Sequence, residues 1–238
     1  MDINMEYRKT GSDTCTLVFK SNVEGIATTY ANLYRRSLLQ STPKFSVAGI
    51  RCNSNGNYAK NFFEIIPGMT TSLTDVYMSL FNAVYDIDCE SDNIILSVVL
   101  SDGFNLSDLC DKEKTSPKFG TDYNSIQLVS PDKKITSVVG NNNIIIDVYL
   151  KRSVGFLGKD INVESLKRIV GDSDISTWIV CDSQHRGVAS VSYNSDTKLG
   201  RQTVTLDVKS HQNNIEEVIR GCTEHIKKII TKFEEVAI

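Results

Sequence analysis

The 238-residue sequence lacks an excess of positive charge, and it lacks long apolar runs. Its 26 Lys and Arg residues stand against 29 Asp and Glu residues, which gives a formal net charge of −3. A protein that binds nucleic acid by itself carries a basic footprint, so the composition argues against that class. No apolar run approaches the roughly 18 residues of a membrane span, and the polar amino-terminal stretch contains no signal-peptide core. We therefore expect a cytosol-like compartment and no membrane partner.

The six cysteines and three histidines show no metal-binding spacing. No two cysteines form a C-x-x-C pair, and the histidines show neither H-E-x-x-H nor H-x-H spacing. In a reducing compartment, the simplest interpretation of the cysteines is that they are small buried hydrophobic residues. We expect neither a metal ion nor a cofactor.

Sequence motifs for catalysis and nucleotide binding are also missing. The chain contains no G-x-x-x-x-G-K-[ST], G-x-G-x-x-G or G-x-S-x-G motif, and spacing ties no Ser or Cys to a His. Asp86 and Asp88 form a D-x-D pair that could hold a divalent cation in a transferase, although a solvated connector is the favoured interpretation. We expect no catalytic residues, and a scaffold, adaptor or subunit of a larger assembly fits better than a free-standing enzyme.

Apolar periodicity predicts an α+β fold. Helical spacing occurs at 25–40, 72–86 and 214–236, with a shorter helix at 163–170. Alternating or continuous apolar runs predict strands at 14–19, 45–51, 94–100, 144–150, 178–181, 188–193 and 203–208. Residues 101–135 are polar and rich in turn residues, which predicts loops and short strands. The elements do not alternate as they would in a doubly wound parallel sheet.

The helix at 214–236 presents more apolar surface than one small sheet needs. Its apolar side continues for about six turns at 3.6 residues per turn, with acids in the first turn and lysines late, the order that the helix dipole favours. A helix of this length can bury one part on its own sheet and another part on a partner. Complete burial within one chain is the alternative.

The helix at 25–40 carries a motif that resembles a known family. The run T-Y-A-N-L-Y-R-R-S-L-L occupies 29–39, Pro43 follows it, and T-L at 16–17 ends the preceding strand. This order and spacing is similar to the T-L strand, the T-L-G-N-A-L-R-R-x-L-L helix and the proline of the alpha subunit of multi-subunit RNA polymerase, in its amino-terminal assembly domain. Two positions depart from that pattern, since Ala31 replaces a glycine and Leu33 replaces a small residue.

The resemblance extends in element order over residues 14–236. F-E-I-I-P-G-M-T at 63–70 lies where that family has a loop of the pattern E-[FY]-x-x-I-x-G-V-x-E-D. Y-L-K-R-S-V-G-F at 149–156 is similar to a strand followed by a G-R-G-Y-type turn. The segment 182–193 resembles an S-P-V-x-x-V-x-Y strand without the S-P-V, and 203–208 resembles L-x-L-x-[IV].

The resemblance implies a two-part fold and a role in assembly. Residues 1–49 and 185–238 would form a discontinuous dimerisation domain with a sheet and two packed helices, and 50–184 would form an inserted β-rich domain. The chain would be a non-catalytic alpha-like subunit of a DNA-directed RNA polymerase, which is a nucleotidyltransferase complex. It would pair with a second alpha-like chain, as a homodimer or a heterodimer, and form the platform for the two large catalytic subunits. DNA contact would be indirect, and we expect no carboxy-terminal DNA-binding domain.

The resemblance also implies contact residues and a location. Arg35, Arg36 and Leu39 would contact a large subunit. The dimer interface would contain apolar residues of two helices: Ile26, Tyr30, Leu33, Tyr34, Leu38, Ile219, Cys222, Ile226, Ile229, Ile230 and Phe233. The chain would act in the cytoplasm, or in a plastid stroma or an infected host's cytoplasm. The alternative that the residues leave open is a dimeric α+β adaptor unrelated to transcription.

Overall fold

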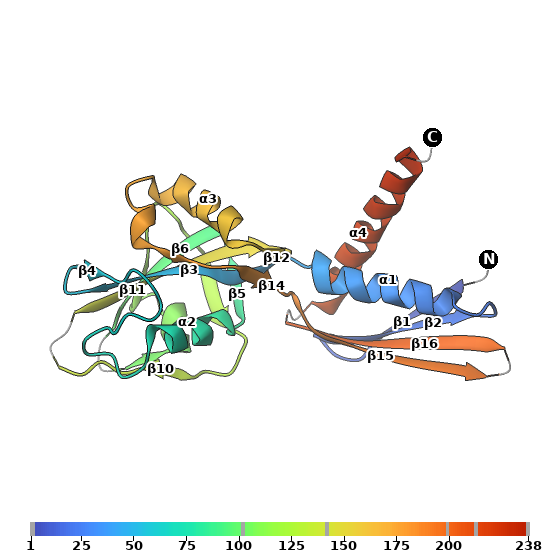
Figure 1. The fold of residues 1–238 in the computed structure, drawn as a ribbon. Coiled ribbons are helices and arrows are strands. Elements are labelled where there is room, and N and C mark those ends of the chain that lie inside the picture. Colours follow the sequence, from blue (N-terminus) through green and yellow to red (C-terminus); the bar gives the residue numbers. More distant parts are fainter. Residues whose placement is uncertain (1–2, 101–102, 141–142, 199, 212–213, 237–238) are drawn as a thin grey trace. The chain divides into compact units, whose positions relative to one another are not determined.

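The protein is described by a computed structural model that covers residues 3–100, 103–140, 143–198, 200–211 and 214–236. Two compact units divide the chain (Figure 1). Met1–Pro43 and Arg186–Ile238 form the first, called here the discontinuous unit, and Lys44–His185 forms the second, called the inserted unit. The range 50–184 expected for the inserted part lies within Lys44–His185, and residues 44–49 and His185, expected in the discontinuous part, belong to that unit as well.

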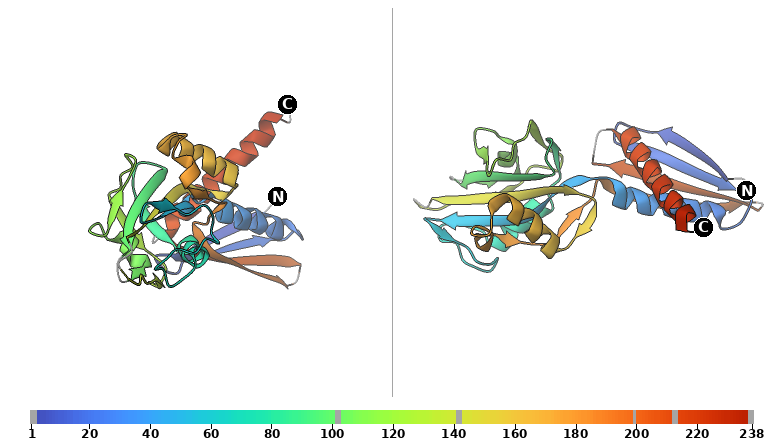
Figure 2. Two further views of the ribbon diagram at one scale, coloured as in Figure 1. Left: turned by 60° about the vertical axis from the view of Figure 1, so that its left-hand side comes forward. Right: turned by 90° about the horizontal axis from the view of Figure 1, so that it is seen from above.

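The discontinuous unit consists of one antiparallel sheet with two helices on one face. The strand order is β1-β2-β16-β15. The bounds are β1 (Ile3–Lys9), β2 (Thr14–Ser21), β15 (Val188–Lys198), β16 (Arg201–Ser210), α1 (Ile26–Ser41) and α4 (Ile215–Val236). Both helices lie on the same side of the sheet (Figures 1 and 2). One layer of helices over one layer of strands gives this unit a single core.

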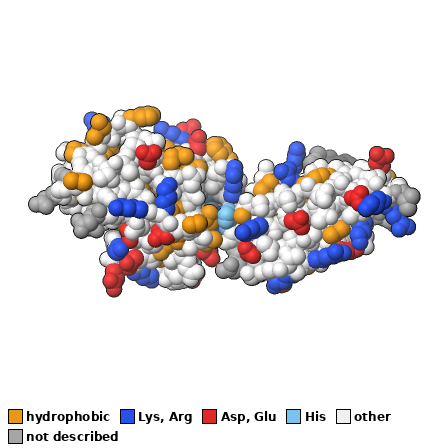
Figure 3. All heavy atoms as spheres, turned by 90° about the horizontal axis from the view of Figure 1, so that it is seen from below, with side chains coloured by type: hydrophobic (Ala, Val, Ile, Leu, Met, Phe, Trp, Pro, Cys, Tyr) orange, Lys and Arg blue, Asp and Glu red, His pale blue; other side chains and the backbone are white. Residues whose placement is uncertain are grey.

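Strand alternation decides which face of this sheet is apolar. Leu17 and Phe19 of β2 and Leu206 of β16 point to the helix side and are fully buried, because successive side chains of a strand face opposite sides. On the other face, the Thr16 hydroxyl donates a hydrogen bond of 2.7 Å to Asp207. Acidic and basic side chains are interspersed on this open face (Figure 3). The core of the unit therefore lies on the helix side of the sheet.

The inserted unit is built on an antiparallel sheet with a helix on each face (Figure 1). Its strand order is β13-β3-β11-β6-β8, and β4 pairs with β3 beside this path. The bounds are β3 (Lys44–Ser54), β4 (Asn57–Tyr58), β6 (Asn93–Leu100), β8 (Thr115–Pro117), β11 (Ile144–Ser153), β13 (Ile179–Val180), α2 (Leu73–Phe81) and α3 (Lys159–Val170). The central strands are buried on both faces, which explains their nearly continuous apolar runs.

Short ribbons and turns complete the inserted unit. Two-stranded pairings join β10 to β7, β12 to β14 and β5 to β9. The bounds are β5 (Tyr85–Asp88), β7 (Phe104–Asn105), β9 (Ser125–Leu128), β10 (Lys134–Thr136), β12 (Gly155–Leu157) and β14 (Ser183–His185), with 3-10 turns η1 (Leu106–Cys110) and η2 (Ile175–Thr177). No helix in the described part of the chain is long and apolar enough to cross a membrane.

The predicted α+β class is confirmed, and two helix predictions need correction. The helix expected at 72–86 ends at Phe81, because the backbone N–H and the amide of Asn82 both bond to the carbonyl of Met78. Residues 85–88 form strand β5 instead. The helix expected at 163–170 begins at Lys159, where the Asp182 carboxylate accepts a bond of 2.7 Å from the backbone N–H. Strand β1 was not expected, since its mostly exposed residues lack a clear apolar pattern.

Candidate interaction surface

Helix α1 is fixed on its sheet at its start and along one face. At its start, the Gln202 side chain of β16 accepts a bond of 3.1 Å from Gly25 N–H and donates one of 2.8 Å to the Thr28 hydroxyl. Gly25 adopts a positive φ of 82°, which glycine permits without strain. The core side of the helix is formed by Ala27, Ala31, Ser37 and Leu38, all buried. The orientation of α1, and so of its outer face, is set by these contacts.

The predicted large-subunit contacts lie on α1 away from this core. Arg35 and Arg36 are exposed, and Leu39 is half-buried. Neither guanidinium forms an ion pair with any residue that the structure describes. A guanidinium carries five N–H donors in a planar fork that suits carboxylates and carbonyls. With no ion-pair partner in the described part of the chain, the two adjacent arginines are therefore available to another chain.

The predicted interface residues of α1 are buried to different extents in the core of their own unit. Leu38 is fully buried, and Ile26, Leu33 and Tyr34 are half-buried. Tyr30 is 38% exposed. Only part of this predicted set is thus left uncovered by the unit itself, and the uncovered part is centred on Tyr30.

Helix α4 continues its apolar stripe beyond the sheet that it covers. The buried members of the predicted stripe are Ile219, Cys222 and Ile226. Further along, Ile229 is half-buried and Ile230 is 47% exposed. The side chain of Phe233 lies outside the described part of the structure. The carboxy-terminal half of α4 projects past α1 and the sheet (Figure 1), so the end of the stripe lies beyond the elements that the structure describes in its unit.

Strand β1 adds two apolar side chains that sequence reasoning missed. Met5 pairs with Phe19 and Tyr7 pairs with Leu17, so both lie on the helix side of the sheet. They are nevertheless 38% and 40% exposed. Their position on the helix side depends on how the edge strand β1 pairs with β2. No local pattern in the sequence indicates that pairing. The helix side of the discontinuous unit thus has uncovered apolar groups on α1, α4 and β1.

The inserted unit exposes a second apolar feature in the loop before α2. Phe63 is 88% exposed and Ile65 is 89% exposed. Beside them, a hollow of about 440 Å³ is lined by neighbours that include Phe62 and Ile66. Folded proteins rarely leave adjacent large apolar groups this open without a binding role. The F-E-I-I-P run at 63–67 was visible in the sequence, but nothing in it indicated exposure.

The acidic pair considered as a metal site lies on a strand. Asp86 and Asp88 are exposed on the same side of β5, and the Asn124 amide donates a bond of 3.3 Å to Asp88. Within the described ranges, no group of three or more His, Cys, Asp or Glu residues is arranged to hold a metal ion. The structure therefore offers no support for a metal-dependent transferase.

Buried His185 is the centre of a polar network in the inserted unit. Its Nδ1 lies 2.8 Å from the Lys44 carbonyl oxygen, which can only accept, so Nδ1 carries the proton. Its Nε2 then accepts from the Ser183 hydroxyl at 2.8 Å, and that hydroxyl accepts from the Asn162 amide at 3.0 Å. Burial lowers the pKa of His185, because desolvation disfavours the charged ring. The network holds a neutral imidazole and has a structural role.

Comparison with curated proteins finds alpha subunits of DNA-directed RNA polymerase. The subunit of Onion yellows phytoplasma (strain OY-M) is 23% identical over 195 residues, which cover 82% of this chain and 54% of that protein. That of Cytophaga hutchinsonii is 24% identical over 190 residues, which cover 78% and 51%. The chain is similar to RNA polymerase alpha subunits. The resemblance drawn from the Arg-Arg helix is confirmed by these matches.

Two further facts define the extent of this similarity. A second phytoplasma alpha subunit, from the Aster yellows witches'-broom strain AYWB, is 23% identical over 188 residues. No family model matches the sequence. The alpha-subunit-like chain spans about half the length of the curated relatives it matches. The similarity covers elements of both units, since it extends over about four-fifths of the chain.

Proposed function

We propose that the chain is a non-catalytic, alpha-like subunit of a multi-subunit DNA-directed RNA polymerase. The discontinuous unit dimerises with a second alpha-like chain, and the dimer is the platform on which the two large catalytic subunits assemble. The observation that carries this proposal is the apolar stripe of α4, which continues to half-exposed Ile230 after its own sheet has ended. The chain contacts DNA only through the complex and acts where transcription occurs, in the cytoplasm, a plastid stroma or an infected host's cytoplasm.

A second alpha-like chain is the occupant that suits the helix side. The uncovered groups there, which include Tyr30, Ile230 and Tyr7, are large and apolar, and their burial is favourable in proportion to the area covered. Another copy would present the same groups around a two-fold axis, so one set of residues would serve both partners. A homologous but different chain would match equally well. The proposal therefore includes homodimers and heterodimers.

The large subunits are the partners that suit the remaining exposed groups. Arg35 and Arg36 point donors to solvent from a rigid helix, and Leu39 beside them provides an apolar contact. Phe63 and Ile65 give the inserted unit a separate apolar contact. Aromatic and arginine side chains are the groups that contribute most to protein interfaces. We therefore assign these five residues to large-subunit binding.

The test is affinity purification of the tagged chain from its native cells, analysed by mass spectrometry and by transcription activity of the eluate. We expect two large co-purifying chains and nucleotide polymerisation. Arg36→Ala should keep the second alpha-like chain but recover at most about a tenth of the large subunits, a loss of about 1.4 kcal/mol. Lys60→Ala, at another exposed basic residue, is the matched control. Recovery of the chain alone, or with small partners only, would contradict the proposal and favour an adaptor.

A further inference from the structure

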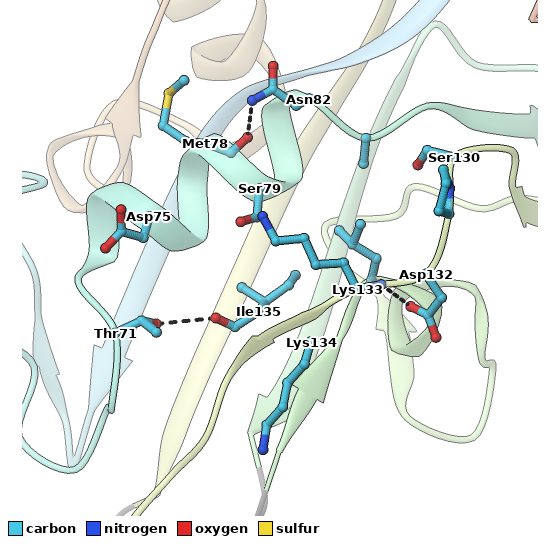
Figure 4. Close-up of a pocket in the computed structure, with 13 residues that line it drawn as sticks. Thr71, Asp75, Met78, Ser79, Asn82, Ser130, Asp132, Lys133, Lys134 and Ile135 are labelled. Carbon is cyan, nitrogen blue, oxygen red and sulfur yellow. Dashed lines mark hydrogen bonds between the residues drawn. The ribbon is translucent and has the colours of Figure 1, made fainter.

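The inserted unit contains an open groove of about 660 Å³ between α2 and the segment 130–135 (Figure 4). Asp75 and Asp132 line this groove together with Lys133 and Lys134, so charge selects no particular occupant. A surface that does select its occupant lies in the discontinuous unit, at the outer edge of strand β15.

Strand β15 is a long sheet edge. It pairs with β16 along one side, and no strand in the described part of the chain pairs with its other side. Figure 1 shows β15 at the rim of its sheet. After Val188, its residues are exposed or half-buried. An edge strand of 11 residues leaves a row of N–H and C=O groups that can pair with another strand.

The other edges of the two main sheets are short or charged. In the inserted unit, the sheet ends at β8 with three residues and at β13 with two. The opposite edge of the discontinuous unit, β1, carries three charged residues, Glu6, Arg8 and Lys9. Arg8 forms an ion pair of 2.7 Å with Glu6. Short strands and charged side chains are the means by which proteins prevent sheet edges from pairing.

The segment 190–195 of β15 lacks these protections. It contains no charged residue and no proline. It follows the register shift between Val188 and Ser190, so it pairs regularly with β16. The charges of the strand come only after it, where Lys198 and Asp196 form an ion pair of 2.8 Å. The segment is therefore a regular, neutral edge that is open to pairing.

Side chains alternate between the two faces along this edge. Tyr193 lies opposite the buried Leu206 of β16, so Tyr193 and Val191 are on the helix side of the sheet. Ser192 and Asn194 are exposed on the open side. Tyr193 is 39% exposed, although it is on the apolar side. An added strand would therefore need apolar groups on the helix side and small polar groups on the open side.

We propose that the β15 edges of two copies of this chain pair antiparallel about a two-fold axis through Ser192. In this register, Val191 of each copy faces Tyr193 of the other on the helix side. Ser190 faces Asn194 on the open side, and Ser192 faces its own equivalent. Apolar groups meet apolar groups, polar groups meet polar groups, and no like charges lie opposite each other. One set of residues serves both copies, as in other two-fold interfaces.

The side chains favour this occupant and this register over others. An axis through Tyr193 would place Ser195 against Val191, which sets a polar group against an apolar one. Nucleic acid is a poor occupant, because the segment 190–195 contains no Lys or Arg to contact phosphates. The edge is separate from the apolar stripe of α4, so this inference does not rest on the proposed dimer of alpha-like chains. Because the paired strands cover little apolar surface, we expect a weaker association than that dimer.

Oxidative cross-linking of the full chain tests the register. Directly opposite residues of an antiparallel pair have Cα atoms about 4.5–5.5 Å apart, which is within the range of a disulfide. Ser192→Cys should therefore give a cross-linked dimer on mild oxidation. Asn194→Cys is the matched control, because the two copies of residue 194 would lie about 14 Å apart along the strands. A mixture of Ser190→Cys and Asn194→Cys should cross-link, since these positions face each other.

Non-reducing electrophoresis measures the cross-linked fraction. The wild type gives the background from the six native cysteines. We expect at least about ten times more dimer for Ser192→Cys than for Asn194→Cys, in line with an interface that holds one register. Equal fractions in these two variants would overturn the proposal, as would a Ser192→Cys fraction no higher than that of the wild type.

A second measurement avoids added thiols. Ser192→Lys would place two ammonium groups opposite each other at the axis, which disfavours pairing. In an Ile230→Asp background, which weakens the proposed helix-side dimer, Ser192→Lys should raise the remaining dissociation constant at least about tenfold. Thr197→Lys adds the same charge to an exposed residue of β15 beyond the paired segment and is the control. Equal constants in sedimentation equilibrium, or no association in Ile230→Asp alone at any concentration, would contradict edge pairing and leave the α4 interface unaffected.

Discussion

His185 gives the protein a pH dependence that can be assigned to one side chain. The folded state lowers the pKa of this buried ring, whereas the unfolded chain titrates near the ordinary value of about 6.5. As the pH falls below that value, the unfolded state takes up a proton that the folded state does not. The free energy of unfolding therefore decreases toward acid, by up to about 1.4 kcal/mol per pH unit from this residue.

Urea unfolding between pH 7.5 and pH 5.5 measures this contribution. The wild type should lose stability over that range, and His185→Gln should be less stable at pH 7.5 but should lose less on acidification. A glutamine amide can still donate to the Lys44 carbonyl oxygen, which limits the damage at neutral pH. If wild type and variant lose stability in parallel, His185 is not the group that titrates.

Gly187 and Gly221 are predicted to respond to alanine in opposite directions. A Cβ at Gly187 would lie 2.3 Å from Thr42 Cγ2 and 2.9 Å from the Thr42 carbonyl oxygen, so the backbone must move. Gly187→Ala should reduce the free energy of unfolding by about 1–3 kcal/mol. A Cβ at Gly221 meets nothing within 4 Å, and Gly221→Ala in the exposed part of α4 should stabilise by about 0.5–1 kcal/mol. Chemical denaturation measures the free energy of unfolding of both variants. If Gly187→Ala is as stable as the wild type, Thr42 can move away from the added methyl group.

At the level of elements, sequence periodicity predicted those parts that repeat locally. The helices at 25–40 and 214–236 were found close to their observed bounds because their apolar residues repeat every three to four positions. The helix at 72–86 was predicted too long, because apolar residues continue after it. Two of these, Tyr85 and Ile87, are alternate residues of strand β5 and are buried on one side of that strand. The exposure of Arg35 and Arg36 follows from helical spacing, whereas Met5 and Phe63 depend on strand register and loop path, which local spacing does not encode.

The distal part of α4 carries the prediction for dimerisation. An aspartate at position 230 would place a charge in the proposed interface, where burial without a partner is costly. Ile230→Asp should raise the dimer dissociation constant at least about tenfold, or 1.4 kcal/mol, with an unchanged circular dichroism spectrum, because the side chain is already 47% exposed. Thr231→Asp adds the same charge on an exposed position of the next residue and is the control. Sedimentation equilibrium gives both constants, and equal values would remove α4 from the interface.

The molecule as a whole combines two units with separate hydrophobic cores. The largest core cluster lies within the inserted unit, around residues that include Leu80 and Ile94, and another is formed by the sheet and helices of the discontinuous unit. Apolar groups left open on the discontinuous unit include side chains of α1, α4 and β1. An oligomer that covers only these groups stabilises one unit by mass action and leaves the other unchanged.

Because the two units have separate cores, amide hydrogen exchange in each unit should depend differently on protein concentration. When the concentration rises through the dimer dissociation constant, amides of α1 and of the second half of α4 should exchange more slowly. Those of β3, β11 and β6 in the inserted unit should keep their rates, because their core is complete within one chain. Hydrogen exchange with mass spectrometry at two concentrations measures both sets in one sample. Protection that rises in the inserted unit instead would move the dimer interface there, and no change in either unit would mean that the chain does not self-associate and needs a different alpha-like partner.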